Sequence, residues 1–115
     1  MGTTKLLAKV EANLDAIIEK FSYEENFSKK SYRQRPNLWV KYGKARLYVP
    51  RNAYEQAGYI DLLTGEIHET RPGNYSVLEE VLNFINSLPD PTEEQEEQAE
   101  ETVKENTKEG LKEKR

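Results

Sequence analysis

Residues 37–50 constrain the fold more than any other part of the chain. Apolar and polar side chains alternate on both sides of Gly43-Lys44, and this dipeptide suits a two-residue turn with glycine at its first central position. The segment therefore predicts a β-hairpin from about Asn37 to Pro50. Because successive strand residues point to opposite sides of a sheet, the two faces of this hairpin differ in chemistry.

A turn at Gly43-Lys44 determines which residues of the two strands lie opposite each other. The pairs expected on one face are Tyr42 with Ala45, Val40 with Leu47, and Leu38 with Val49. The pairs expected on the other face are Lys41 with Arg46, and Trp39 with Tyr48. Like charges directly opposite each other destabilise a sheet. A cation pair beside two aromatic rings therefore suggests a surface kept for an anionic partner, and nucleic acid is the first candidate.

Two amphipathic helices are predicted on either side of the strand-forming region. The first runs from about Thr4 to Phe21, with Thr3 or Thr4 as its N-cap, because apolar residues recur there at three- and four-residue spacing. The second begins with a capping box, Ser76-x-x-Glu79, and is stopped by Pro89. Its apolar stripe consists of Val77, Leu78, Val81, Leu82, Ile85 and Leu88.

A second hairpin is predicted over residues 58–69, with a turn over residues 61–66. Gly65 stands in this turn where a left-handed residue is needed. Ile60 and Ile67 are expected to face the core. Residues 52–57, just before this hairpin, are compatible with one helical turn that Gly58 would end.

The segment 22–37 is polar and has no clear period, so we interpret it as an ordered loop or a mobile arm. Aromatic residues alternate in it with four cations, which are Lys29, Lys30, Arg33 and Arg35. A connection of this length in a compact domain is more often functional or flexible than incidental. One interpretation is a basic arm that lies along phosphates, and the other is an ordinary solvated loop.

Residues 90–115 are predicted to be a disordered acidic tail of low complexity. They contain ten acidic and five basic residues, and after Pro91 only Val103 and Leu111 are sizeable apolar residues. Such a segment buries too little apolar surface to offset its ordering entropy, although its composition allows transient helix. It would be inert solubilising chain, a competitor of nucleic acid for the basic hairpin, or a contact for a basic partner.

The predicted fold class is α+β: one domain over residues 1–89, followed by the tail over residues 90–115. Its two hairpins form a four-stranded antiparallel sheet, with the N-terminal and C-terminal helices packed on one face. The side chains expected to point at the helices are Leu38, Val40, Leu47, Val49, Ile60 and Ile67. Those expected to point at solvent are Trp39, Lys41, Arg46 and Tyr48.

The positive charge of the chain is concentrated around the first hairpin. Residues 28–58 hold eight lysines and arginines against one glutamate, although the whole chain has a net charge of −4. The candidate nucleic-acid-binding residues are Trp39, Lys41, Lys44, Arg46 and Tyr48, aided by Lys29, Lys30, Arg33 and Arg35. A structural alternative is a cross-strand aromatic pair that shields the sheet, with cations that aid solubility.

Three functions follow, in order of preference. The first is a small non-enzymatic nucleic-acid-binding or accessory domain that uses the basic and aromatic hairpin face. The second is a protein–protein interaction module that docks through the same sheet face. The third and least favoured is a metal-dependent hydrolase at Asp61, Glu66 and His68. The structural alternative for this last group is ordinary turn chemistry, with Asp61 capping its own turn.

Several classes are disfavoured by what the sequence contains. The chain has no cysteine, which excludes a disulfide scaffold, a thiolate metal site and a cysteine nucleophile, and fits a reducing, cytoplasmic setting. Its apolar runs are too short to span a membrane, and we expect no secretory signal. It has no P-loop and no Rossmann glycine pattern, so no cofactor is expected. The expected partner is DNA, RNA or a protein.

Overall fold

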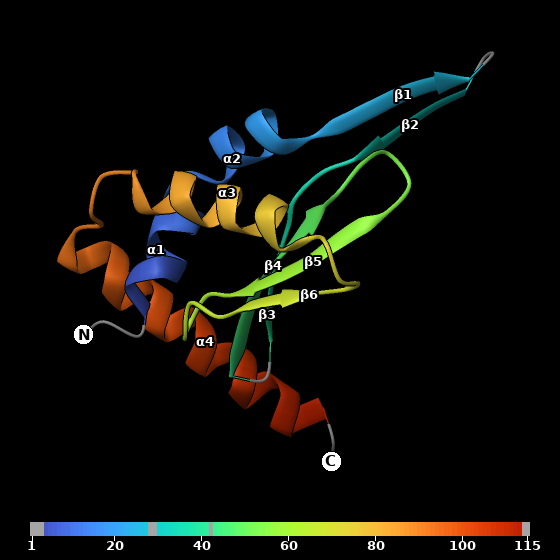
Figure 1. Ribbon diagram of the computed structural model, residues 1–115. Helices are drawn as coiled ribbons and strands as arrows, with labels where there is room; N and C mark the ends of the chain where they lie inside the picture. Colours follow the sequence, from blue (N-terminus) through green and yellow to red (C-terminus); the bar gives the residue numbers. More distant parts are fainter. Residues whose placement is uncertain (1–3, 28–29, 42, 114–115) are drawn as a thin grey trace.

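The computed structural model describes residues 4–27, 30–41 and 43–113, with side chains placed for 4–25, 33–41 and 43–103. The elements in chain order are α1 (Lys5–Ala12), α2 (Leu14–Phe21), β1 (Tyr23–Phe27), β2 (Lys30–Gln34), β3 (Asn37–Lys41), β4 (Lys44–Pro50), β5 (Gln56–Asp61), β6 (Ile67–Glu69), α3 (Tyr75–Asn86) and α4 (Glu93–Glu113). Strands β3 to β6 form an antiparallel sheet in chain order, and β1 and β2 form a separate two-stranded sheet (Figure 1).

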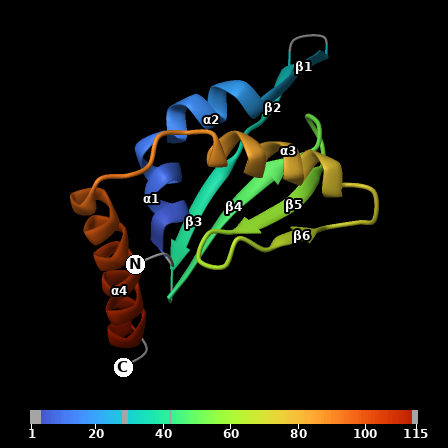
Figure 2. The ribbon, with the colours of Figure 1, turned by 60° about the vertical axis from the view of Figure 1, so that its left-hand side comes forward.

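The α+β class and the four-stranded antiparallel sheet are confirmed. Helix α3 packs on β5 and β6, and α1 packs against α3 and α4 (Figure 2). The core lies between these helices and the inner side of the sheet. Its largest fully buried apolar residues are Leu7, Val10, Ile17, Leu47, Val49, Ile60, Leu62, Leu78, Val81 and Ile85. The predicted stripe of the second helix is confirmed in α3, where Leu78, Val81 and Ile85 are buried.

The register predicted for the first hairpin is wrong by two residues. Leu38 pairs with Leu47, Trp39 with Arg46, and Lys41 with Lys44. The paired Lys41 and Lys44 therefore have only residues 42 and 43 between them, and Tyr42 lies outside the described residues. Gly43 has φ +74°, which suits the second central position of a two-residue turn with positive φ. Because a shift of two residues keeps every side chain on its own side of the sheet, the predicted faces survive.

The long N-terminal helix predicted from the sequence is instead two helices. The break lies at Asn13, which has φ −129° and ψ 22°. The Asn13 side-chain amide donates a hydrogen bond to the carbonyl of Lys9 at 2.9 Å, so a local polar contact competes with the continuous helical ladder. The break changes the direction of the chain (Figure 1) and lets α2 bury Phe21 edge-on against Phe84 of α3, with ring centres 5.5 Å apart.

The predicted capping box of the second helix is also wrong. Helix α3 begins at Tyr75, and its N-cap is Asn74 rather than Ser76. The carbonyl of Asn74 accepts hydrogen bonds from the N–H groups of Val77 and Leu78, which places the first turn two residues earlier than the box requires.

The helical turn considered for residues 52–57 is absent. The side chain of Asn52 accepts hydrogen bonds from the N–H groups of Tyr54 and Glu55 and forms an Asx turn. Gly58 ends no helix, because it lies inside β5 and pairs with Glu69 of β6.

Residues 22–37 are not a loop, because most of them form the β1–β2 hairpin. This two-stranded ribbon extends away from the rest of the molecule (Figures 1 and 2). Glu24 lies opposite Arg33, and their charged groups are 3.7 Å apart. Period-two pairing of this kind is difficult to recognise in so polar a segment, since neither face carries a run of apolar residues.

The tail that we predicted to be disordered forms helix α4, so that prediction is wrong. Its start has a capping box: the N–H of Thr92 donates to the side-chain oxygen of Gln95 at 2.9 Å, and the N–H of Gln95 donates to the hydroxyl of Thr92 at 3.2 Å. Ala99 is fully buried and Val103 packs against the core. Helix α4 thereby contacts α1 and β3. The division between a domain over residues 1–89 and a tail over 90–115 stays a prediction.

The contact between α1 and α4 leads to a prediction about pH. A cavity of about 310 Å³ between these helices is lined by Glu11 and five uncharged residues, and burial raises the pKa of Glu11 above its ordinary value of 4.5. A raised carboxyl pKa means that folding penalises the ionised form. Glu11→Gln should therefore stabilise the protein at pH 7, and the gain should vanish as the pH falls below 4.5, where both states hold the proton. Urea unfolding midpoints of the wild type and of Glu11→Gln, measured at pH 7 and below pH 4.5, test this.

The matched control for this prediction is Glu97→Gln on α4. Glu97 is exposed, so removing its charge should change stability by no more than about 0.5 kcal/mol at either pH. An equal change in stability for the two substitutions would show that burial between α1 and α4 does not destabilise the ionised Glu11 side chain.

Candidate nucleic-acid interface

The outer face of the four-stranded sheet, opposite the face that packs on α3, carries most of the predicted site. Alternation along the strands places at least one ring or cation from each strand there: Trp39 of β3, Arg46 and Tyr48 of β4, Tyr59 of β5 and His68 of β6. All of them are half-buried or exposed. We call these five residues the outer-face cluster.

Three rings of the cluster form a row across β4, β5 and β6. Tyr48 lies opposite Tyr59, and Tyr59 lies opposite His68. The ring centres of Tyr48 and Tyr59 are 5.4 Å apart at an angle of 50°, and those of Tyr59 and His68 are 4.7 Å apart at 17°, which is a stacked arrangement. Cross-strand aromatic pairs of this kind stabilise a sheet and present a continuous surface of rings.

Arg46 lies at the centre of the cluster. Its guanidinium carbon is 4.4 Å from the ring centre of Tyr59 and 5.6 Å from that of Trp39. Its Nη1 donates a hydrogen bond to the hydroxyl of Tyr48 at 3.3 Å, and this bond is the main reason why the pKa of Arg46 is raised. Its Nε is buried without a hydrogen-bond partner. Cation–π contacts of a planar guanidinium rigidify this arrangement.

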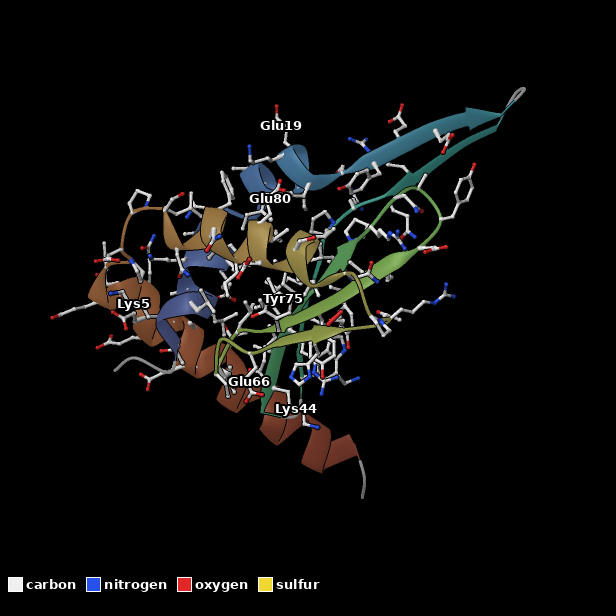
Figure 3. All side chains as sticks on the ribbon, viewed as in Figure 1. Lys5, Glu19, Lys44, Glu66, Tyr75 and Glu80 are labelled. Atoms are coloured by element: carbon white, nitrogen blue, oxygen red, sulfur yellow. The ribbon has the colours of Figure 1, made fainter. Side chains whose placement is uncertain are left out.

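Two lysines stand at one end of the sheet, beside the β3–β4 turn. Lys41 and Lys44 lie directly opposite each other and both are exposed. The opposed like charges expected from the sequence therefore exist, but at this pair rather than at Lys41 and Arg46. Figure 3 shows Lys44 and Glu66 at the same end of the sheet, because the β3–β4 and β5–β6 turns lie side by side there.

The structure brings together some of the predicted residues and separates others. Trp39, Arg46 and Tyr48 meet in one cluster. Arg33 belongs to the β1–β2 ribbon and pairs with Glu24, and Arg35 is exposed between β2 and β3. The backbone of Lys30 lies in β2, although its side chain and all of Lys29 are outside the described residues.

Sequence reasoning missed Tyr59 and His68 as members of this surface. The signal was present: once Ile60 and Ile67 are assigned to the core, alternation sends the neighbouring Tyr59 and His68 to the other face. The sequence predicted one four-stranded sheet but not which strands join the two hairpins. It is the pairing of β4 with β5 that places Tyr59 beside Tyr48.

The acidic and histidine group considered for metal chemistry does not converge. The carboxylate of Asp61 accepts hydrogen bonds from the N–H groups of Leu63 and Thr64, so it caps its own turn. Glu66 and His68 are neighbours, with Oε2 and Nε2 3.9 Å apart. Across the described residues, no group of three or more His, Cys, Asp and Glu side chains is arranged to hold a metal ion.

Comparisons with known proteins do not assign a family or a function to this chain. No protein-family model matches the chain, and neither a curated protein nor a solved structure matches it. Within the described residues, no helix has both the length and the apolar character needed to cross a membrane.

Proposed function

We propose that this protein is a small non-enzymatic domain that binds single-stranded nucleic acid on the outer face of its four-stranded sheet. The observation that carries the proposal is the outer-face cluster: four rings and one arginine, drawn from all four strands, on the face that does not pack on α3. Proteins that bind single strands combine aromatic rings that stack on bases with cations that meet the backbone phosphates.

The roles of the residues follow from their positions. His68 stands at the β6 end of the ring row, and Trp39 lies outside the row, on β3 opposite Arg46. Both offer ring faces to bases. Lys41 and Lys44 are exposed at the end of the same sheet, where a strand that crosses the rings would present its phosphates. Arg46 serves mainly to hold the rings of Tyr59 and Trp39 in place, since its guanidinium already lies against both.

A second candidate function is docking of a protein partner on the same cluster. Two observations favour it: Arg46 is engaged within the cluster, and Asp61, opposite Arg46, and Glu66, beside His68, add negative charge near it. Aromatic rings with an arginine are also typical of binding hot spots between proteins. The two functions differ in their response to salt, because phosphate contacts release counterions and apolar docking does not.

Trp39 makes the test direct, because it is the only tryptophan in the chain. We expect single-stranded oligo(dT) or oligo(U) to change its fluorescence saturably at low salt, with an affinity that falls steeply as salt increases. Replacing Lys41 and Lys44 together with alanine should weaken binding and flatten the log–log salt dependence by about 0.7 for each phosphate that is no longer neutralised. Both side chains are exposed, so the fold should persist.

Arg51→Ala is the matched control, because Arg51 is an exposed cation just beyond the opposite end of β4. It should leave affinity and salt slope nearly unchanged. An equal loss for the two variants would mean that general charge, rather than this surface, attracts the oligonucleotide. If no oligonucleotide, single- or double-stranded, changes the fluorescence or the mobility of the protein at low salt, the nucleic-acid function is wrong.

A further inference from the structure

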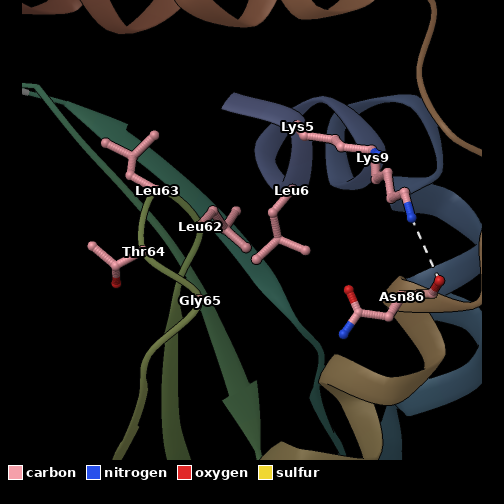
Figure 4. A pocket seen from close by; sticks show the side chains of 8 residues that line it. All are labelled: Lys5, Leu6, Lys9, Leu62, Leu63, Thr64, Gly65 and Asn86. Carbon is pink, nitrogen blue, oxygen red and sulfur yellow. Dashed lines mark hydrogen bonds between the residues drawn. The ribbon is translucent and has the colours of Figure 1, made fainter. Parts of the chain in front are cut away.

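A pocket lies on the other side of the molecule's sheet from the outer-face cluster, between α1, the β5–β6 turn and the end of α3. Its volume is about 290 Å³, close to the lower limit of ligand pockets in proteins. Three leucines, Leu6, Leu62 and Leu63, form its apolar part, and Lys5, Lys9 and Asn86 line its polar part. Figure 4 shows the leucines and the side chains of Lys9 and Asn86 around this space.

Lys9 is the unusual member of this pocket because it is a buried cation. Only 8% of its side chain is exposed. Its ammonium group donates to the main-chain carbonyl of Asn86 at 3.4 Å and lies 3.4 Å from a carboxylate oxygen of Asp90. Charge-assisted bonds of this type are usually about 2.7–2.9 Å long. The Lys9 ammonium group is therefore removed from water but held only by long contacts. An anion that approached it more closely would stabilise it further.

The Asp90 contact shows what kind of group fits there. One oxygen of this carboxylate, Oδ1, lies 3.4 Å from the ammonium groups of both Lys5 and Lys9. The two lysines are four residues apart on α1, so their side chains project from the same side of the helix. Together they form a cradle for an anionic oxygen. Hydrogen bonds that the Asp90 carboxylate accepts, first in size from Lys9 and second from Lys5, lower the pKa of Asp90.

Asp90 is well placed to leave this cradle. It lies between Pro89 and Pro91, after the last residue of α3 and before α4, and its side chain is 71% exposed. An ion pair at so exposed a carboxylate contributes little to stability. Its departure breaks no helical hydrogen bond, because it lies outside both helices.

We propose that this pocket binds a small organic anion. The anionic group of the ligand replaces the Asp90 oxygen between Lys5 and Lys9, and a short apolar body lies against Leu6, Leu62 and Leu63. The chemistry is a terminal carboxylate or phosphate on a body of about the size of one aromatic ring, which the pocket volume admits. This site is separate from the outer-face cluster, and its test does not depend on nucleic-acid binding.

The probes for the experiment are benzoate, phenyl phosphate and the uncharged benzamide, each titrated into the full chain labelled with ¹⁵N. We expect benzoate or phenyl phosphate to shift the backbone amides of Lys9, Leu63 and Gly65 saturably, and benzamide to bind at least about tenfold more weakly. A response to only one of the anions decides between a carboxylate and a phosphate.

Two variants separate a ligand site from a purely structural ion pair. Asp90→Asn removes the internal competitor and should tighten anion binding by about threefold or more. Lys9→Met keeps the apolar stem of the side chain and removes its charge, so it should weaken binding by about tenfold. Lys20→Met is the matched control: Lys20 is an exposed lysine on α2, beside Phe21 and Phe84, and does not line the pocket.

The outcomes that would overturn the proposal are concrete. If neither anion causes saturable shifts at these amides in Asp90→Asn, the lysine pair serves only to hold the connector between α3 and α4. Equal affinity for benzoate, phenyl phosphate and benzamide would show an apolar hollow with no role for the cations. An unchanged affinity in Lys9→Met, in a variant with a native spectrum, would equally contradict the assignment.

Discussion

Gly58→Ala should destabilise the protein by more than about 4 kcal/mol, a size that single substitutions rarely reach. Gly58 has φ +147°, and a Cβ at this position would lie 2.0 Å from the carbonyl oxygen of His68 and 3.0 Å from Cα of Glu69. These are backbone atoms of the adjacent strand, so no side-chain rotation relieves the clash. The only relief is separation of β6 from β5 around the Gly58–Glu69 pair, which removes sheet hydrogen bonds and uncovers Ile60 and Ile67.

Gly65→Ala provides the matched control. Gly65 also has a positive φ, +82°, but a Cβ there would meet no described atom within 4 Å beyond Gly65 and its two chain neighbours. Its cost should be that of an L-residue in left-handed conformation alone, about 1–2 kcal/mol. Urea denaturation compares the unfolding free energies of the two variants. Hydrogen exchange of the backbone amides of β6 shows whether this strand separates from β5 in Gly58→Ala. Similar midpoints for the two variants would mean that β6 does not approach β5 as closely as the structure has it.

The first hairpin shows how much of this fold the sequence could predict. The alternation of apolar and polar residues determines which side of the sheet each residue occupies, and that assignment is confirmed by the burial of Leu47 and Val49. The register was missed because Gly43 fits either central position of a two-residue turn. Moving the turn by one position shifts the register by two residues and leaves every face unchanged, so hydrophobic patterning alone cannot distinguish the alternatives.

The helices show a second limit. Apolar spacing continues through Asn13, so a periodicity argument predicts one helix, whereas a single side-chain hydrogen bond to Lys9 accompanies its division into two. For α4 the capping box Thr92-x-x-Gln95 was present in the sequence. The low apolar content of residues 90–115 nevertheless predicted disorder. Ala99 is fully buried in the core, but a side chain this small does not identify a core position in the sequence.

The candidate site was predictable in its location and not in its internal contacts. Strand alternation places Trp39, Arg46 and Tyr48 on one face. It does not show that Arg46 would lie against Tyr59, or that His68 would stack on Tyr59, because these contacts depend on the pairing of β4 with β5 and of β5 with β6. The pocket at Lys9 was hidden for the same reason: its walls come from α1, α3 and the β5–β6 turn.

Leu47→Ala should cost about 2–5 kcal/mol of unfolding free energy, the usual range for a truncated buried leucine. Leu47 is fully buried in β4, an inner strand, and it lies in the row Leu38, Leu47, Ile60 and Ile67 across the inner face of the sheet. The volume-conserving Leu47→Met should cost less than about 1.5 kcal/mol. Lys44→Ala, at an exposed position of the same strand, should stay within about 0.5 kcal/mol of the wild type.

The Leu47 measurement also tests the outer-face cluster, because the two faces of β4 are linked by strand alternation. If Leu47 points inward, the adjacent Arg46 and Tyr48 must point outward, where they meet Trp39 and Tyr59. A urea midpoint of Leu47→Ala as close to the wild type as that of Lys44→Ala would place Leu47 on the surface. Arg46 and Tyr48 would then belong to the interior, and a nucleic acid or protein partner could not reach the surface on which the proposed function depends.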